Sequence, residues 1–183
     1  AGILPRRGSA DFALDVRGLA LHRLARVAQR EDLGLAGTID VSGRLQGTAA
    51  APRFAGEVHA PGLEARNRAL DRVEGTVRYA DLDLDVGLDA WSGETPVFRV
   101  DGRWPFSWSL DGSRRDVSDR EVALSLRADS LPAGLVLAVL EDLEDTRGAV
   151  SGVLEVGGTT SALRPEGRVR LEDGAWTVGA LGA

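Results

Sequence analysis

Three aspartates at alternate positions, Asp81, Asp83 and Asp85, have the type and spacing in this chain that most suggest a cation site. Residues two apart in a strand point to one face and lie roughly 6.6 Å from each other. A Ca²⁺ ion gathers oxygen ligands at about 2.3–2.6 Å, normally from a loop that wraps around it. Because a straight strand cannot converge on an ion, the spacing indicates a solvated charged face, which also discourages edge-to-edge aggregation.

Other residues with catalytic potential are few. The two histidines, His22 and His59, stand in unrelated contexts, and we interpret both as surface residues. Around Ser151, the positions that a Gly-x-Ser-x-Gly nucleophile motif reserves for glycine hold Ala149 and Val153. The chain has no cysteine for thiolate chemistry and no lysine to serve a phosphate-binding loop. We therefore expect no enzyme activity, no metal and no cofactor.

The overall composition narrows the class of protein further. The formal net charge of −6 argues against nucleic acid as a partner and against docking by charge on anionic lipid. The longest apolar run, residues 133–140, is far shorter than the roughly 20 residues of a membrane-spanning helix. The chain has no methionine and its first residues form no signal peptide. We therefore expect a fragment of a longer protein, with any anchor or export signal outside it.

Alternation of apolar and polar residues predicts a chain made mainly of strands. In ADLDLDVGLDA (80–90) every second residue from Leu82 to Leu88 is Leu or Val, and aspartates occupy most of the intervening positions. The apolar parity changes between Tyr79 and Leu82, which predicts a bulge or tight turn near Ala80. The same pattern predicts strands at 12–16, 38–45, 56–60, 75–90, 96–104, 106–110, 121–128, 152–156, 167–174 and 175–179.

Two segments follow a helical period instead. We expect one short helix near 19–32 and another near 131–143. Ser130 is predicted to cap the second helix, with Pro132 in its first turn.

The chain also repeats itself. FALDVR (12–17) returns as VALSLR (122–127), and each copy precedes a predicted helix and a glycine-led strand. GTAAAPRFAG (47–56) then returns as GTTSALRPEG (158–167). A repeat of about 110 mostly β residues suggests an elongated stacked fold.

The repeat divides the chain into a first unit over 1–119 and a second, incomplete unit over 120–183. A sheet with one apolar face must bury it, and two short helices cannot cover about ten strands. Either the sheet folds onto itself and fills its interior, or it curls into a trough that leaves the interior for a ligand.

This order of strands, helices and glycine-led turns resembles the TamB family, the inner-membrane subunit of the translocation and assembly module, within the AsmA-like group. In the second copy Leu163 replaces Pro52, and Pro165 follows two positions later. The segments that carry the resemblance are LAGTIDVSGRLQGTAAAPRFAGEV (35–58), RVEGTVRYADLDLDVGLDA (72–90) and GAVSGVLEVGGTTSALRPEGRVRLEDGAW (148–176), together with the repeated strands.

The resemblance implies a periplasmic, mainly β protein whose elongated sheet curls into a trough, often called a β-taco. A segment outside this fragment would tether it to the inner membrane. Implied partners are phospholipid acyl chains, a TamA-like β-barrel in the outer membrane and the remainder of the same long chain. Implied roles are phospholipid transport to the outer membrane and assistance to outer-membrane protein assembly.

A trough with an apolar lining would suit acyl chains, because each CH₂ group exposed to water costs roughly 0.8 kcal/mol. We predict that one face of the sheet forms this lipid groove. Its predicted lining comprises Ile39, Val41, Leu45, Val58, Val77, Tyr79, Leu82, Leu84, Val86, Leu88, Val100, Trp104, Leu124, Leu126, Leu154, Val156, Val169 and Leu171.

Alternatives remain open at this point. The alternation of Trp104, Phe106 and Trp108 suits either core packing or an aromatic patch at a groove. Arg114 and Arg115 suit either a solvated loop tip or a headgroup contact. Two alternatives concern the whole chain. One is a structural or adhesive β-solenoid with a closed core, and the other is an enzyme on a β scaffold.

Overall fold

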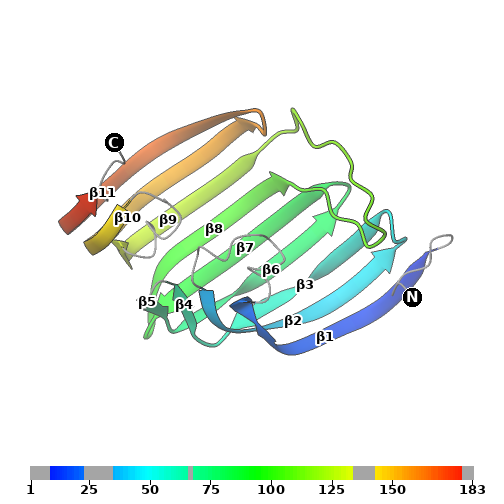
Figure 1. Ribbon diagram of the computed structural model, residues 1–183, viewed down its shortest axis with the longest axis horizontal. Coiled ribbons are helices and arrows are strands. Elements are labelled where there is room, and N and C mark those ends of the chain that lie inside the picture. Colours follow the sequence, from blue (N-terminus) through cyan, green and yellow to red (C-terminus); the bar gives the residue numbers. More distant parts are fainter. Residues whose placement is uncertain (1–8, 23–34, 66–67, 134–142, 179–183) are drawn as a thin grey trace.

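The computed structural model describes residues 9–22, 35–65, 68–133 and 143–178. These residues form one curved, open, antiparallel sheet (Figure 1). The strands are β1 (Ala10–Ala20), β2 (Leu35–Gly47), β3 (Pro52–Ala60), β4 (Leu63–Ala65), β5 (Arg68–Leu70), β6 (Arg72–Ala80), β7 (Asp83–Ser92), β8 (Thr95–Pro105), β9 (Ala123–Pro132), β10 (Leu143–Thr159) and β11 (Ala162–Val178). The expectation of a mainly β fold is confirmed, and the curved open sheet is consistent with a trough.

The topology is a simple meander. Strand β4 pairs with β2 beyond the end of β3, and β5 pairs with β4 just before β6 begins. The two short strands therefore extend the β3–β6 pair. Eight successive antiparallel pairings then lead from β1 through β2, β3, β6, β7, β8, β9 and β10 to β11. Among the described strands, β1 pairs with β2 alone and β11 pairs with β10 alone.

Buried side chains gather in two small clusters near opposite ends of the strands. One cluster comprises Leu70, Ala90, Val97 and Leu131. The other comprises Leu45 and Ala49, with Ala10, Phe12, Phe54 and Trp108 packed against them. Between these clusters, the middle of the sheet carries no buried cluster within the described residues. The sheet is therefore anchored at its two rims rather than around one central core.

A two-residue turn separates β6 from β7, which confirms the tight turn predicted near Ala80. Asp81 and Leu82 both have positive φ values, 53° and 72°. Such a turn matches the twist of the strands that it joins. Leu82 therefore lies in the turn and not on the strand where the alternation placed it.

The predicted strand at 106–110 is wrong, because residues 106–110 belong to a long connection between β8 and β9. Pro105 ends β8. The Phe106 amide then donates to the Leu82 carbonyl at 2.8 Å, and the Leu110 amide donates to the Ala49 carbonyl at 2.8 Å. These hydrogen bonds hold residues 106–110 against the β6–β7 turn and the β2–β3 turn. The predicted strands at 167–174 and 175–179 are parts of the single strand β11.

The structure differs from both helix predictions at the ends of the predicted segments. Leu19 and Ala20 belong to β1, where they pair with Ile39 and Thr38. Ser130, expected as a helix cap, lies inside β9 with a φ of 55°. Residues 131–132 pair with β10, and residue 143 pairs with β11. Strand pairing thus takes the place of capping there, and residues 23–34 and 134–142 lie outside the described residues.

The hairpins β2–β3 and β10–β11 share their geometry. Gly47 pairs with Pro52 in the first, and Gly158 pairs with Leu163 in the second. The two glycines have φ values of 93° and 91°. A Cβ added to Gly47 would lie 2.4 Å from the Ala51 carbonyl oxygen, and a Cβ added to Gly158 would lie 2.3 Å from the Ala162 carbonyl oxygen. The repeat of about 110 residues and its two units stay a prediction.

Glycine is required where neighbouring strands approach closely. Gly102 has a φ of 136°, and an added Cβ would lie 2.0 Å from the Ala123 carbonyl oxygen. We expect Gly102→Ala to destabilise the sheet by about 1–3 kcal/mol, because the two strands would have to separate. Urea unfolding followed by circular dichroism measures this effect.

Gly87→Ala is the matched control on the adjacent strand. A Cβ at Gly87 would meet its nearest atom, on the Asp101 side chain, at 3.4 Å. We expect its unfolding midpoint to stay near that of the unsubstituted chain. Equal midpoints for the two alanine variants would contradict the steric explanation.

Candidate functional site

The register of the sheet collects apolar residues on a single face, which we call the apolar face. Directly opposed residues in an antiparallel pair point to the same side. The central row crosses from β1 to β11 through Val16, Val41, Val58, Gly75, Leu88, Val100, Leu126, Leu154 and Gly167. Every position in this row is apolar or glycine.

Two further rows run beside the central row with the same property. One contains Leu14, Gly43, Gly56, Val77, Val86, Gly102, Leu124, Val156 and Pro165. The other contains Phe12, Leu45, Phe54, Tyr79, Leu84 and Trp104. The apolar face is thus continuous from one edge of the sheet to the other.

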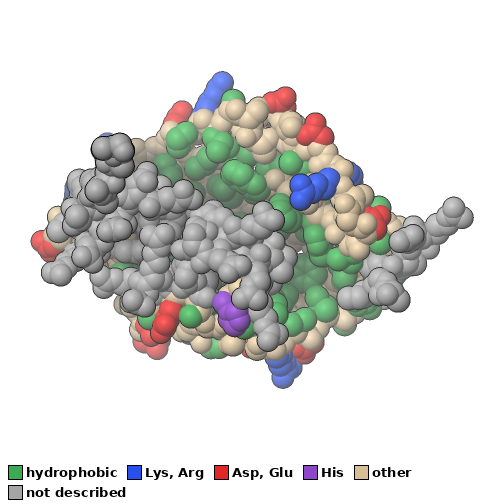
Figure 2. Space-filling model, viewed as in Figure 1, with side chains coloured by type: hydrophobic (Ala, Val, Ile, Leu, Met, Phe, Trp, Pro, Cys, Tyr) green, Lys and Arg blue, Asp and Glu red, His purple; other side chains and the backbone are tan. Residues whose placement is uncertain are grey.

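Most of the predicted lining residues lie on this face and are only partly buried. Leu45 and Tyr79 are buried, with exposed fractions of 5% and 2%, whereas Val169 is 59% exposed. Leu82 lies in the β6–β7 turn. The remaining predicted residues are intermediate between buried and exposed: Ile39, Val41, Val58, Val77, Leu84, Val86, Leu88, Val100, Trp104, Leu124, Leu126, Leu154, Val156 and Leu171. Figure 2 shows hydrophobic side chains gathered in the hollowed side of the molecule.

The predicted lining left out several residues of the apolar face, among them Phe12 and Phe54, although the alternation in their segments indicates them. The glycines within the rows were also left out. A Cβ added to Gly43 or Gly56 would lie 2.9 or 2.6 Å from the ring of Phe54, so this ring covers the glycine pair. The glycines therefore leave room on the face for larger neighbours.

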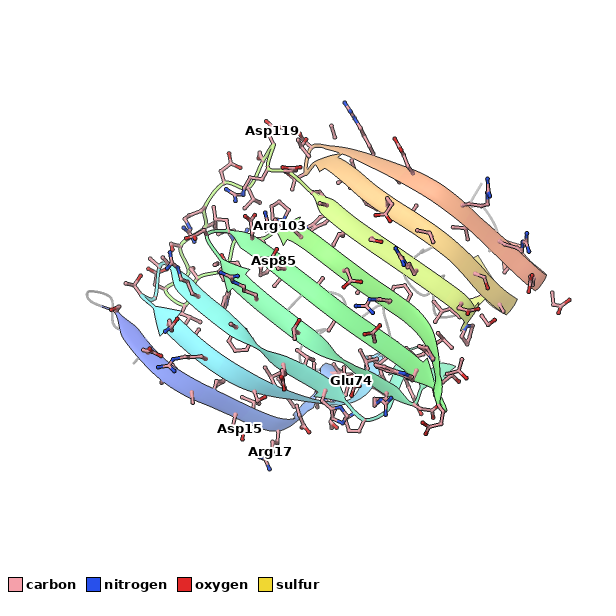
Figure 3. All side chains as sticks on the ribbon, turned by 180° about the vertical axis from the view of Figure 1, so that it is seen from behind. Asp15, Arg17, Glu74, Asp85, Arg103 and Asp119 are labelled. Atoms are coloured by element: carbon pink, nitrogen blue, oxygen red, sulfur yellow. The ribbon has the colours of Figure 1, made fainter. Side chains whose placement is uncertain are left out.

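The opposite side of the sheet, the polar face, carries ion pairs. Asp85 accepts a hydrogen bond from Arg103 Nε at 2.8 Å, and Figure 3 shows the two side chains together. Both oxygens of Asp83 lie 2.9 Å from Arg120 Nη2. Asp81 stands in the turn, so the three aspartates do not form one straight row. Within the described ranges, no group of three or more acidic or histidine side chains is placed to hold a metal ion.

On the polar face, ion pairing moves the pKa values of acidic and basic groups further from 7. Hydrogen bonds from Arg44 and then Gln46 lower the pKa of Asp11. The hydrogen bond to Asp85 raises the pKa of Arg103. These groups are therefore charged at neutral pH, which is typical of structural pairs and unlike a general acid or base.

A hollow of about 510 Å³ on the polar face is lined by Asp15, Arg17, Asp40, Glu57, His59 and Glu74, among others. Figure 3 labels three of these residues, Asp15, Arg17 and Glu74, on β1 and β6. The His59 ring lies 3.7 Å from the Glu74 carboxylate, and both side chains are more than 40% exposed. Asp15 and Arg17 form an ion pair at 3.0 Å on the border of the same hollow.

The connection from residue 106 to residue 122 borders one end of the apolar face. The Tyr79 hydroxyl donates to the Trp108 carbonyl at 3.3 Å and accepts from the Trp108 amide at 3.1 Å. The two rings meet edge to face, with centroids 5.3 Å apart. Further along, the Thr160 amide donates to the Arg120 carbonyl at 3.0 Å. Trp108 is therefore a packing residue, whereas Phe106 is 48% exposed.

We expect Tyr79→Phe to loosen this connection. The change removes both hydrogen bonds to Trp108 and leaves partly buried backbone groups without their partner, at a cost of about 1–3 kcal/mol. Thermal unfolding measures the stability loss, and limited proteolysis reports cleavage within residues 106–122. Ser109→Ala is the control, because Ser109 is hydrogen-bonded only within the connection, to Ser113. Equal protease sensitivity of both variants would contradict the anchoring role of Tyr79.

Comparison with known proteins gives no relative from which to transfer a function. The chain has no significant match among protein-family models, curated proteins or solved structures. Across the described residues, no helix has both the length and the apolar character needed to cross a membrane.

Proposed function

We propose that this chain is a segment of a TamB-like periplasmic protein whose apolar face shields acyl chains during phospholipid transport to the outer membrane. The observation that carries the proposal is the set of apolar rows that cross the sheet without a polar interruption. The order of repeated motifs supports the same family. An accompanying role in outer-membrane protein assembly, with a TamA-like barrel, is part of this proposal.

Partial burial of the rows favours a ligand on the apolar face. A fully packed core would bury Val86 and Leu124 completely. Both side chains are only partly buried. Covering such surface is favourable by roughly 25 cal/mol per Å². A hydrocarbon chain supplies matching apolar surface and makes no hydrogen bonds that would fix it at one place. This fits movement along the face better than tight binding at one point.

The dimensions of the face also suit a hydrocarbon chain. Eight strand-to-strand steps of about 4.8 Å give a path of about 38 Å from β1 to β11. One leaflet of a bilayer's hydrocarbon core is about 15 Å thick. An acyl chain lying across the strands therefore fits within the path and has room to shift along it.

A closed β-solenoid suits the described residues less well. Its stacked coils enclose a dry interior, whereas these strands form an open antiparallel meander. Lipid extraction separates the two functions: mass spectrometry of the purified chain is expected to detect bound phospholipid or fatty acid. A chain that carries no lipid and binds no added fatty acid would contradict the transport proposal.

A pair of adjacent substitutions tests the apolar face directly. Leu124 lies on it, opposite Gly102 and Val156, whereas exposed Ala123 lies on the polar face opposite Arg103. We expect Leu124→Asp to weaken binding of a fluorescent fatty acid about tenfold or more, because a carboxylate would enter the hydrocarbon path.

Ala123→Asp introduces the same charge one residue away and is expected to leave fatty-acid binding unchanged. Circular dichroism and the unfolding midpoint report whether both variants stay folded. Val86→Asp, on the same row two strands away, provides a second test on the apolar face. Equal binding by the Leu124 and Ala123 variants, both folded, would contradict a ligand on this face.

A further inference from the structure

A recess in the apolar face lies where two glycines oppose each other, and we call it the glycine recess. Gly43 on β2 pairs directly with Gly56 on β3. Their neighbours in the same row are Leu14 on β1 and Val77 on β6. Two adjacent strands thus place no side chain on the face between these larger neighbours. Both strands are paired on either side, so the recess belongs to the interior of the sheet.

The ring of Phe54 fills the glycine recess. A Cβ added to Gly43 would lie 2.9 Å from the ring atom Cε2, and a Cβ added to Gly56 would lie 2.6 Å from the ring atom Cζ. The outer end of the ring therefore lies on both glycines at once. Phe54 is only partly buried. Its remaining surface is the part of the apolar face that a ligand would meet at this place.

Packing alone holds this ring in position. Phe54 lies opposite Leu45 on β2 and Tyr79 on β6, and it packs against the buried cluster of Leu45 and Ala49. A phenylalanine side chain has no donor or acceptor that would fix its direction by a hydrogen bond. A smaller side chain at position 54 would leave the glycine recess open, because the glycines have no side chains to fill it.

The filled recess has consequences for the shape of a ligand. A straight hydrocarbon chain can lie on a level surface and bury its whole length there. A chain with methyl branches needs room below that surface, and branches held away from it stay in water. Each CH₂-sized group left exposed in this way weakens binding about fourfold.

We propose that Phe54 determines which acyl chains the apolar face accepts, because its ring closes the glycine recess and so favours straight chains over branched ones. This inference rests on the proposed function, since it assigns a specificity-determining residue to the same face. Phe54 acts through the volume of its ring and needs no charge. The ligand class that fits the closed recess is therefore a straight-chain acyl group.

A purely structural role for Phe54 makes a different prediction. An aromatic ring placed on a glycine is also a device that stabilises strand pairing. Loss of such a ring would lower the stability of the sheet but would leave the preference between two ligands unchanged. The preference, measured as a ratio of binding constants, therefore separates the two roles.

Competition binding to the 183-residue chain tests the proposal. Hexadecanoic acid and phytanic acid, which is the same chain with methyl branches, are each used to displace a fluorescent fatty acid. For the unsubstituted chain we expect phytanic acid to bind about tenfold or more weakly than hexadecanoic acid. In Phe54→Ala we expect the ratio of the two inhibition constants to approach one, because the branches can enter the open recess.

Phe54→Leu removes less volume and guards against loss of the fold in Phe54→Ala. Its ratio is expected to lie between those of the unsubstituted chain and the alanine variant. The ratio does not depend on the fraction of folded chain, because both acids compete for the same folded molecules. Circular dichroism confirms that each variant is folded.

Phe12→Ala is the matched control. Phe12 lies in the same row as Phe54 and also faces Leu45, but the residue two positions further along its strand is Leu14. Removing the Phe12 ring therefore leaves Phe54 on the glycine pair. We expect this variant to keep the ratio of the unsubstituted chain.

Three results would overturn the proposal. They are equal inhibition constants of the two acids for the unsubstituted chain, a ratio that both Phe54 variants leave unchanged, and an equal fall of the ratio in Phe12→Ala. In each of these results the chain still binds hexadecanoic acid, so the proposed function stands. An unsubstituted chain that binds neither acid contradicts the proposed function itself, and this inference with it.

Discussion

The register between neighbouring strands is the constraint on which the structure depends. Side chains alternate between the two faces, so a slip of one residue in any pairing would move a whole strand's apolar set to the other side. Hairpin turns such as Asp81–Leu82 set the register locally. Close approaches at Gly47 and Gly102 also leave no room for a side chain between the paired backbones. The continuity of the apolar rows follows from all of these pairings together.

The distribution of buried residues gives this sheet an uncommon energetic organisation. Small clusters around Leu45 and Leu131 secure the two rims, and the connection anchored by Trp108 joins one rim to the neighbouring turns. The strands between the rims depend more on backbone pairing and on ion pairs such as Asp85–Arg103. Exposed ion pairs contribute little individually. Apolar surface between the rims therefore remains accessible, and this accessibility connects the fold with the proposed function.

Much of the architecture was predictable from alternation alone. Most strands and the face of Val41, Val86 and Leu126 followed from the period of two, because each such strand has one apolar side. Turn chemistry decided the errors. Leu82 has the parity of a strand residue but lies in a turn, and residues 106–110 alternate because Trp108 packs on Tyr79. Cross-strand relations, such as Glu166 facing Glu155, depend on pairing partners that periodicity within one segment does not specify.

The nearest-neighbour order of the meander has a consequence for how the chain acquires its structure. Along the path from β1 to β11, each strand pairs with the next strand of the path, so no pairing joins the two ends of the chain. Pairing between successive strands keeps the sequence separation of paired residues smaller than a topology that joined distant segments would. The sheet is therefore suited to growth by zipping, one hairpin at a time from its N-terminal side, as the polypeptide emerges from a ribosome or a translocation channel. Each newly added strand would serve as the template for the next.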